Sequence, residues 1–223
     1  MSLADRIVVV GFDHRTADPA AVERACALKR AHGGALRLPE DVRGVPVETC
    51  HRLELYLEEV TVARAREIYR RWIGGDDAWP EDLPREIPVR VGEEVGRHLF
   101  RVCSGLESAV LGEDQILQQL RAGYRSACEG GLPGPVTHRL FHAAFRVGKK
   151  VRAETDLAAG GRSLAGAAVV QLHRELDGLA GRRALLLGLG EMGRLAARRL
   201  HKRGIGELHL CNRTRDKAER LAA

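Results

Sequence analysis

The feature that most constrains the fold is a glycine-rich loop between a strand pattern and a helix pattern. Residues 183–187, Arg-Ala-Leu-Leu-Leu, indicate a strand, and a helix pattern runs from 193 to 202. Between them the first glycine can make the turn, the second can admit a pyrophosphate, and the third lets helix pack on strand. We therefore predict that the loop binds a dinucleotide through Gly188, Leu189, Gly190, Glu191, Met192 and Gly193.

A second strand pattern at 207–211 ends in Asn212, Arg213 and Thr214. Sites selective for NAD place an acidic residue there to hold the ribose hydroxyls, whereas an arginine suits the 2′-phosphate of NADP. This ending predicts NADPH as the cofactor, with all three residues in contact with it. The alternative is a strand–helix pair that binds nothing.

The rest of the chain changes character near residue 92. Before it, strand patterns (6–12, 44–47 and 53–58) mix with helix patterns (19–32 and 62–73), and after it the pattern is wholly helical (93–111, 116–128, 136–154 and 163–176). Residues 53–58 alternate and predict a half-buried strand. The helix at 136–154 is expected to turn Leu140, Ala144, Val147 and Val151 inward. We predict an α/β catalytic domain with a helical half over 1–158, then a partial Rossmann-type domain over 159–223.

Cys50 lies between two strand patterns and is flanked by Thr49, His51 and Arg52. A thiolate is the attacking form of cysteine, and nearby cationic groups lower the thiol pKa from about 8.5. The neighbours therefore favour a nucleophile. Cysteine is also among the most buried residue types, so a small core side chain is the competing interpretation.

Composition narrows the class of protein. The five cysteines have no paired spacing, which favours a reducing cytoplasm and argues against a disulfide framework or zinc ribbon, and we expect no metal. No apolar run is long enough for a membrane span. The net charge of +6 suits an anionic partner such as nucleic acid or a phosphorylated cofactor, although charge alone is weak support.

Five blocks of sequence, in register over most of the chain, resemble the glutamyl-tRNA reductase family. They are Thr49-Cys50-His51-Arg52-Leu53-Glu54-Leu55-Tyr56, His98 to Ser108 with Val110 to Leu117, Phe145 to Asp156, Gly188 to Gly193, and Asn212 to Thr214. The first block departs from the family pattern in having His51 for asparagine and Leu53 for threonine.

The resemblance implies NADPH-dependent reduction of glutamyl-tRNA to glutamate-1-semialdehyde through a thioester at Cys50, the first step of porphyrin and haem synthesis from glutamate. It also implies that His98 takes part as a proton donor or an orienting group. As a lone histidine among apolar residues, His98 would more often be a core side chain. Longer members of the family are expected to be homodimers that pass their product to the next pathway enzyme.

The resemblance further implies a pocket for the glutamyl group. Arg52 can fork onto its carboxylate, or it can instead be held by Glu54. Glu113 can meet the ammonium group, unless residues 113–115 form a solvated turn. The predicted substrate-binding residues are Thr49, His51, Arg52, Ser108, Glu113, Asp114, Gln115 and Gln119.

Two basic helix faces are candidate tRNA contacts, with a solvated face as the equal alternative. They comprise Arg64, Arg66, Arg70 and Arg71, and Arg146, Lys149, Lys150 and Arg152. Because only two strands of the cofactor domain are expected, we anticipate an exposed half-sheet in either a truncated product or a relative that has lost its C-terminal half. The rival functions are a charged-tRNA-binding fragment, an enzyme that only cleaves the ester, and an unrelated NADP dehydrogenase.

Overall fold

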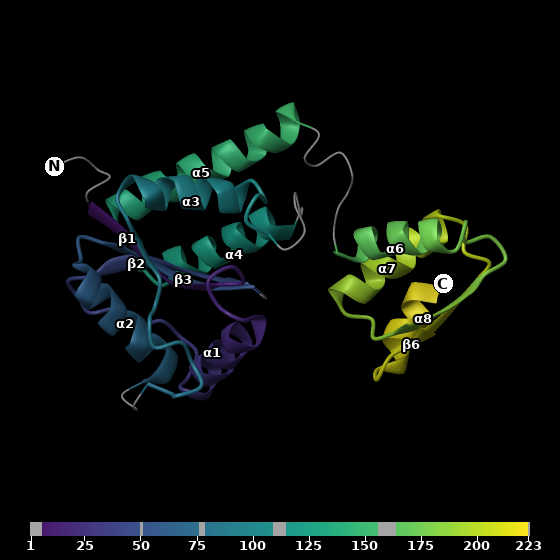
Figure 1. The fold of residues 1–223 in the computed structure, drawn as a ribbon, viewed down its shortest axis with the longest axis horizontal. Helices are drawn as coiled ribbons and strands as arrows, with labels where there is room; N and C mark the ends of the chain where they lie inside the picture. The colour runs from purple at the N-terminus through teal and green to yellow at the C-terminus, as the bar shows by residue number, and fades with distance from the viewer. Residues whose placement is uncertain (1–5, 50, 76–78, 109–114, 156–163, 223) are drawn as a thin grey trace. The chain divides into compact units, whose positions relative to one another are not determined.

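A computed structural model describes residues 6–49, 51–75, 79–108, 115–155 and 164–222. The chain divides into two compact units, Met1–Leu157 and Ala158–Ala223. Figure 1 shows both units, and each is described here by itself.

The N-terminal unit is built on a four-stranded sheet in the order β2-β3-β1-β4, with every neighbouring pair antiparallel. The strands are β1 (Ile7–Asp13), β2 (Arg43–Thr49), β3 (Arg52–Glu58) and β4 (Val89–Val91). The sequence patterns predicted the first three. β4 was missed because a strand of three residues is too short to show a period.

Two helices, α1 (Pro19–Ala31) and α2 (Val62–Gly74), cover one face of this sheet (Figure 1). Asp18 caps α1 by accepting a hydrogen bond from the amide of Ala20, and Thr61 caps α2 by accepting one from the amide of Arg64. Their apolar sides meet alternate residues of the strands, among them Val10, Leu53 and Leu55.

Three helices, α3 (Glu93–Cys103), α4 (Gln115–Glu129) and α5 (Pro135–Glu154), cover the opposite face. The prediction of one helix over 93–111 was wrong, because α3 ends at Cys103 and Gly105 turns the chain with φ of +78°. Residues 109–111 lie outside the described part.

The predicted inner face of α5 was also offset. Of the four residues expected to point inward, Ala144 is fully buried and the others are partly exposed. The buried stripe instead includes Phe141, Phe145 and Gly148. Gly148 lies so close to α3 that a Cβ there would be 2.6 Å from the carbonyl of Cys103. The face of α5 that carries Gly148 is buried because the close approach of α3 leaves no room for a larger side chain there.

The expectation that residues 53–58 form a half-buried strand was wrong, because every residue of β3 is buried. The alternating polar side chains point into the three-helix layer and find partners there. Glu58, for example, accepts hydrogen bonds of 2.6 Å from both the amide and the hydroxyl of Thr137, in the first turn of α5. A buried carboxylate is stable at a helix N-terminus because the free amides and the helix dipole favour negative charge.

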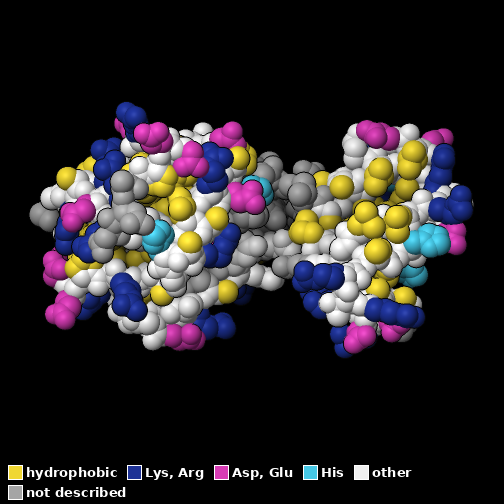
Figure 2. All heavy atoms as spheres, turned by 90° about the horizontal axis from the view of Figure 1, so that it is seen from below, with side chains coloured by type: hydrophobic (Ala, Val, Ile, Leu, Met, Phe, Trp, Pro, Cys, Tyr) yellow, Lys and Arg dark blue, Asp and Glu magenta, His cyan; other side chains and the backbone are white. Residues whose placement is uncertain are grey.

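The C-terminal unit has a two-stranded parallel sheet and three helices: α6 (Leu164–Glu175), β5 (Arg183–Leu187), α7 (Glu191–Lys202), β6 (Glu207–Cys211) and α8 (Arg215–Ala222). Leu186 and Leu208 pack with Val169 and Leu200. On the other face Leu185 and Leu187 are 65% and 73% exposed, and Figure 2 shows hydrophobic side chains at the surface of this unit. Among the described helices, none combines the length and hydropathy that a membrane span requires.

Candidate active site

The sequence predicted a nucleophile, Cys50, at the end of the β2–β3 hairpin. Thr49 pairs with Arg52, so residues 50 and 51 alone connect the two strands. Cys50 itself lies outside the described residues. The amide of His51 donates to Thr49 Oγ1 at 3.3 Å, and its carbonyl accepts from the amide of His14 at 3.0 Å. These bonds fix the hairpin end to the end of β1.

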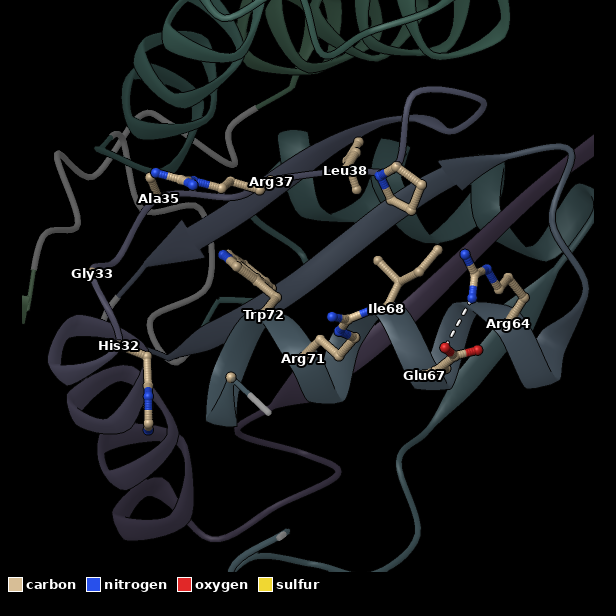
Figure 3. A pocket seen from close by; sticks show the side chains of 12 residues that line it. His32, Gly33, Ala35, Arg37, Leu38, Arg64, Glu67, Ile68, Arg71 and Trp72 are labelled. Atoms are coloured by element: carbon tan, nitrogen blue, oxygen red, sulfur yellow. Dashed lines mark hydrogen bonds and ion pairs between the residues drawn. The ribbon is translucent and has the colours of Figure 1, made fainter. Parts of the chain in front are cut away.

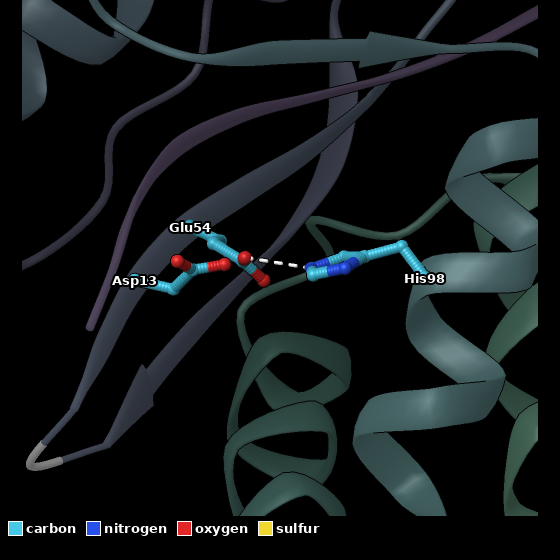
Figure 4. Close-up of side chains that lie close together, drawn as sticks. All are labelled: Asp13, Glu54 and His98. Atoms are coloured by element: carbon cyan, nitrogen blue, oxygen red, sulfur yellow. Dashed lines mark hydrogen bonds and ion pairs between the residues drawn. The ribbon is translucent and has the colours of Figure 1, made fainter. Parts of the chain in front are cut away.

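A buried polar network begins two residues after Cys50 (Figure 4). Arg52, Glu54 and His98 are only 2%, 1% and 5% exposed. Glu54 Oε1 lies 2.8 Å from Arg52 Nη1 and 2.7 Å from His98 Nε2, and Glu54 Oε2 accepts from the hydroxyl of Tyr56 at 3.1 Å. Both oxygens of the carboxylate are therefore satisfied inside the protein.

The network assigns the tautomer of His98. A carboxylate oxygen can only accept, so the 2.7 Å contact requires the proton on Nε2 of His98. Arg52 Nη1, 3.1 Å from the same nitrogen, is also a donor, and both groups donate to Glu54 Oε1. Glu54 therefore orients an imidazole and a guanidinium at once.

The charges of the network stabilise one another. Burial opposes ionisation of Glu54, but the Arg52 guanidinium and the bond from His98 hold the pKa of its carboxyl below the ordinary value. Burial likewise opposes the charge on Arg52, whose pKa is nevertheless raised by Glu54, Tyr56 and Asp13. The sequence left two roles open for Arg52: contact with the substrate carboxylate, or pairing with Glu54. The structure shows the pairing with Glu54.

Asp13 and Glu107 extend the network and were not singled out from the sequence. Asp13 Oδ2 lies 3.7 Å from Arg52 Nη1, and Asp13 Oδ1 accepts from the amides of Arg15 and Thr16 at 2.9 Å.

Glu107 offers its carbonyl to Arg52 Nη2 at 3.0 Å, while its carboxylate pairs with Arg15 at 2.6 Å. These contacts tie the residues before the partly buried Ser108 to the end of β1. An aspartate at the end of an apolar strand, with a threonine three residues later, was the available signal for Asp13.

His14 is a second imidazole that sequence reasoning missed. Its ring lies edge-on to that of His51, with centroids 5.9 Å apart. Burial lowers the pKa of His14, and Arg52 and His51 add to this effect against the opposing charge of Asp13. The ring is therefore neutral near pH 7. Its Nδ1 is buried without a hydrogen-bond partner among the described residues.

Three side chains of the network have the spacing of metal ligands: one ligand atom each of Asp13, Glu54 and His98 lies within 4.8 Å of the other two. Arg52 Nη1 already lies 2.8 Å from Glu54, 3.1 Å from His98 and 3.7 Å from Asp13. A guanidinium thus supplies the positive charge that these carboxylates need, and a divalent cation beside it would be repelled.

The predicted substrate residues on α4 begin near the hairpin end. The amide of Gly44, early in β2, donates to the carbonyl of Leu132 beyond the end of α4, and Gly123 lies against Pro46. The helix therefore runs opposite to β2, and its first turn lies toward Thr49. Gln115 is partly buried and Gln119 is exposed. Glu113 and Asp114 lie outside the described residues, as do Val110 to Gly112.

The glycine loop of the C-terminal unit has the geometry expected for a dinucleotide. Gly188 has φ of +89°, and a Cβ on Gly193 would lie 2.0 Å from the carbonyl oxygen of Gly188. A Cβ on Gly190 would meet nothing within 4 Å, and Gly190 offers no side chain to cap α7. Free amides at a helix N-terminus with open space beside them suit a pyrophosphate.

The residues after β6 divide into two kinds. Asn212 Oδ1 accepts from the amide of Leu189 at 3.0 Å, and its Nδ2 donates to the carbonyl of Thr214 at 2.8 Å. Asn212 thus holds the glycine loop. Arg213 is exposed and Thr214 begins the turn into α8. Met192 is partly buried, and Glu191 starts α7.

A surface pocket of about 720 Å³ lies elsewhere, between α2 and the segment after α1 (Figure 3). Its lining includes Arg37, Arg64, Glu67 and Trp72. Arg64 donates to Glu67 at 2.8 Å, so one of its cations is already neutralised. The pocket contains none of the predicted catalytic, substrate-binding or cofactor-binding residues, although Arg64 and Arg71 of the basic face on α2 line it.

Comparison with known proteins agrees with this geometry. The family model for the glutamyl-tRNAGlu reductase N-terminal domain matches residues 10–155, and the model for shikimate/quinate 5-dehydrogenase matches residues 171–223. The second match fits the strand–glycine loop–helix–strand arrangement of nicotinamide dinucleotide-binding folds.

Relatives named glutamyl-tRNA reductase cover almost the whole chain. The protein from Rubrobacter xylanophilus is 43% identical over 97% of this chain and 52% of its own length, and that from Akkermansia muciniphila is 36% identical over 97% and 65%. The solved structure of glutamyl-tRNA reductase from Methanopyrus kandleri matches with a TM-score of 0.61 and 32% identity over 98% of this chain and 52% of that one. The chain thus spans about half to two thirds of the length of these relatives. It belongs to the glutamyl-tRNA reductase family.

Proposed function

We propose that this chain carries the catalytic part of an NADPH-dependent reductase that converts glutamyl-tRNA to glutamate-1-semialdehyde, the first step of tetrapyrrole synthesis from glutamate. The observation that carries the proposal is the buried Arg52–Glu54–His98 network two residues after Cys50, in a chain of this family. Such a costly arrangement of buried charges is more often retained for function than for stability.

In the proposed first step, the Cys50 thiolate attacks the ester carbonyl of glutamyl-tRNA. A carbon–sulfur bond forms, the carbon–oxygen bond to the tRNA breaks, and the released ribose oxygen takes up a proton. Arg52 supplies positive charge on the side of the thiolate, and His51 is proposed to contact the glutamyl group. The neutral His14 lies beside His51 and is a candidate to accept the thiol proton.

Glu54 and His98 have supporting roles in this proposal. Glu54 holds the Arg52 guanidinium, which has five N–H donors and uses Nη1 and Nη2 within the protein. The remaining donors serve the substrate carboxylate. His98 is a positioning residue, since its Nε2 proton is committed to Glu54. Glu113 is proposed to meet the ammonium of the glutamyl group. The residues proposed to offer it hydrogen bonds are Thr49, Ser108, Asp114, Gln115 and Gln119.

We propose NADPH as the cofactor, which when bound supplies the hydride that reduces the thioester to the aldehyde. The amides of Gly190, Glu191 and Met192 would hold the pyrophosphate, and the exposed Arg213 would meet the 2′-phosphate. Asn212 would act through the loop that it holds. Longer members of the family are proposed to act as dimers that hand the product to a following enzyme.

The test is a single-turnover assay on charged glutamyl-tRNA, with and without NADPH, comparing the unaltered chain with Cys50→Ser. We expect the ester to be lost only when Cys50 is present, and aldehyde to form only when NADPH is also present. Cys26→Ala is the matched control, because burial raises the pKa of the Cys26 thiol and keeps it unreactive. Ester loss that survives Cys50→Ser would refute the proposal. Cys50-dependent ester loss without aldehyde would restrict the function to ester cleavage.

A further inference from the structure

A basic groove of about 570 Å³ lies between α4 and α5, on the outside of the three-helix layer. Its rim carries Arg121 and Arg125 from α4 and Arg146 and Lys149 from α5, all of them exposed. Its floor is aromatic and is formed by the buried rings of Tyr124 and Phe145. We call this the α4–α5 groove.

Within the described part of the chain, no acidic group neutralises the positive charge of the α4–α5 groove. Among the described residues that line it, none is acidic, and Arg125, Arg146 and Lys149 take part in no ion pair within the described part of the chain. Arg121 lies over the ring of Phe145 with its guanidinium carbon 5.6 Å from the centroid, an interaction that leaves its charge intact.

The basic side chains of the other face, on α2, are engaged by groups of the protein. Arg64 pairs with Glu67 at 2.8 Å, Arg66 donates to the carbonyl of Ile87 at 3.2 Å, and Arg70 donates to the carbonyl of Arg85 at 3.3 Å. Arg66 and Arg70 hold the segment before β4 against the helix. The two faces look alike in sequence, but within the described part of the chain Arg64, Arg66 and Arg70 each have a protein partner, whereas no hydrogen bond or ion pair engages Arg125, Arg146 or Lys149.

The floor of the groove is held rigidly by the core. Tyr124 stacks on Phe141 with ring centroids 5.3 Å apart and planes at 12°, and its hydroxyl shares a hydrogen bond with His138. Phe141 also packs edge-on against Tyr56, which reaches Glu54. Cations placed over fixed rings lose little conformational freedom on binding, which favours a preorganised polyanion site.

The groove lies at a fixed distance along α4 from the predicted ester-binding end. At 1.5 Å per residue, Arg121 and Cys128 are roughly 9 and 20 Å along the helix from Gln115. At about 3.4 Å per nucleotide along one strand, this corresponds to roughly three to six nucleotides. A chain of phosphates that starts at an ester near Thr49 could therefore follow α4 into the groove.

We propose that the α4–α5 groove binds the sugar–phosphate backbone of the RNA substrate, within the first several nucleotides of its esterified end. The proposal rests on the proposed function for the identity of the polyanion. The arginines and the lysine neutralise phosphates, which releases counterions and makes the affinity steeply dependent on salt. The α2 arginines serve the fold.

The test measures binding of uncharged acceptor-stem RNA and of whole uncharged tRNA(Glu) by the full chain carrying Cys50→Ser, over a series of salt concentrations. The groove variant combines Arg125→Gln, Arg146→Gln and Lys149→Gln. We expect its affinity at low salt to fall about tenfold or more, and the slope of log K against log salt to become shallower by about 2 to 3. Both RNAs should respond alike, because the contacts lie near the ester.

Two further variants distinguish an effect of the groove residues on RNA binding from an effect of net charge and from an effect of misfolding. Arg24→Gln, Arg30→Gln and Arg97→Gln together remove the same charge from exposed positions outside the groove and should leave the slope unchanged. Arg125→Lys, Arg146→Lys and Lys149→Arg together keep the charge and should restore the slope. An unchanged slope in the groove variant, or equal losses in both glutamine variants, would overturn the proposal. Because the assay needs no ester chemistry, its outcome is independent of Cys50.

Discussion

Strands β3 and β5 belong to different sheets, and the burial of each is the opposite of what its sequence pattern suggests. β3 alternates polar and apolar residues, yet it is buried throughout, because three helices cover its polar face and supply partners for Arg52, Glu54 and Glu58. β5 ends in three consecutive leucines, yet Leu185 and Leu187 are largely exposed. The comparison teaches that a strand pattern reports side-chain chemistry, whereas the covering layers decide burial.

The strongest test of this comparison is Glu54→Ala, which removes the centre of the buried network. We expect unfolding to become easier by about 3 to 5 kcal/mol, because Arg52 loses the partner of its charge. Urea unfolding followed by tryptophan fluorescence measures this, since both tryptophans, Trp72 and Trp79, lie in the N-terminal unit. If Glu54→Ala together with Arg52→Met is no more stable than Glu54→Ala alone, the penalty does not come from an unpaired charge.

A leucine pair compares the two strands directly. Leu55→Ala should cost about 2 to 5 kcal/mol, because its side chain is fully buried among α1 and α2 residues and leaves a cavity. Leu187→Ala in β5 should change stability by less than about 0.5 kcal/mol. Hydrogen exchange of the amides of each sheet gives both values. Equal effects would mean that the open face of β5 is covered in solution.

A glycine pair sharpens the interpretation of the C-terminal unit. Gly193→Ala should destabilise that unit by roughly 2 kcal/mol or more, since its Cβ would collide with a backbone carbonyl. Gly190→Ala meets open space and should leave stability unchanged, while weakening dinucleotide binding if the loop holds the pyrophosphate. Exchange protection of the β5 and β6 amides reports stability, and fluorescence of added NADPH reports binding. A loss of protection in Gly190→Ala would argue against its role as the ligand-facing glycine.

The smallest effect is a pH dependence confined to the N-terminal unit. The pKa of Glu54 and that of Asp13 are lowered in the folded protein, so the unfolded chain binds more protons. Their stabilisation is complete above the ordinary carboxyl pKa values of 4.5 and 3.8 and is lost as the pH falls through the lowered folded values. We expect a slope of up to about 1.4 kcal/mol per pH unit for each group. Repeating the tryptophan measurement from pH 6 to 3 checks this, and the slope should be shallower in Glu54→Gln.

The sequence by itself determined the order of the elements and the local chemistry. The cap of α1, the strands around Cys50 and the strand–glycine loop–helix unit follow from residues near one another in the chain, and short-range sterics and hydrogen bonding suffice to predict them. The family was also recognised from the sequence, through the resemblance of five blocks in register. Gly193 was assigned to helix packing because only a glycine tolerates that approach.

The tertiary structure alone decided which polar groups meet. Arg52, Glu54, His98 and Asp13 come from β3, α3 and β1, and the partners of a buried charge depend on which layers cover it. The same reason explains why His14 beside His51 was missed, why α3 ends early, and why β3 is buried while β5 is open. It also separates the two basic faces, because the backbone carbonyls that accept from Arg66 and Arg70 lie outside α2 and cannot be inferred from a helical pattern of arginines.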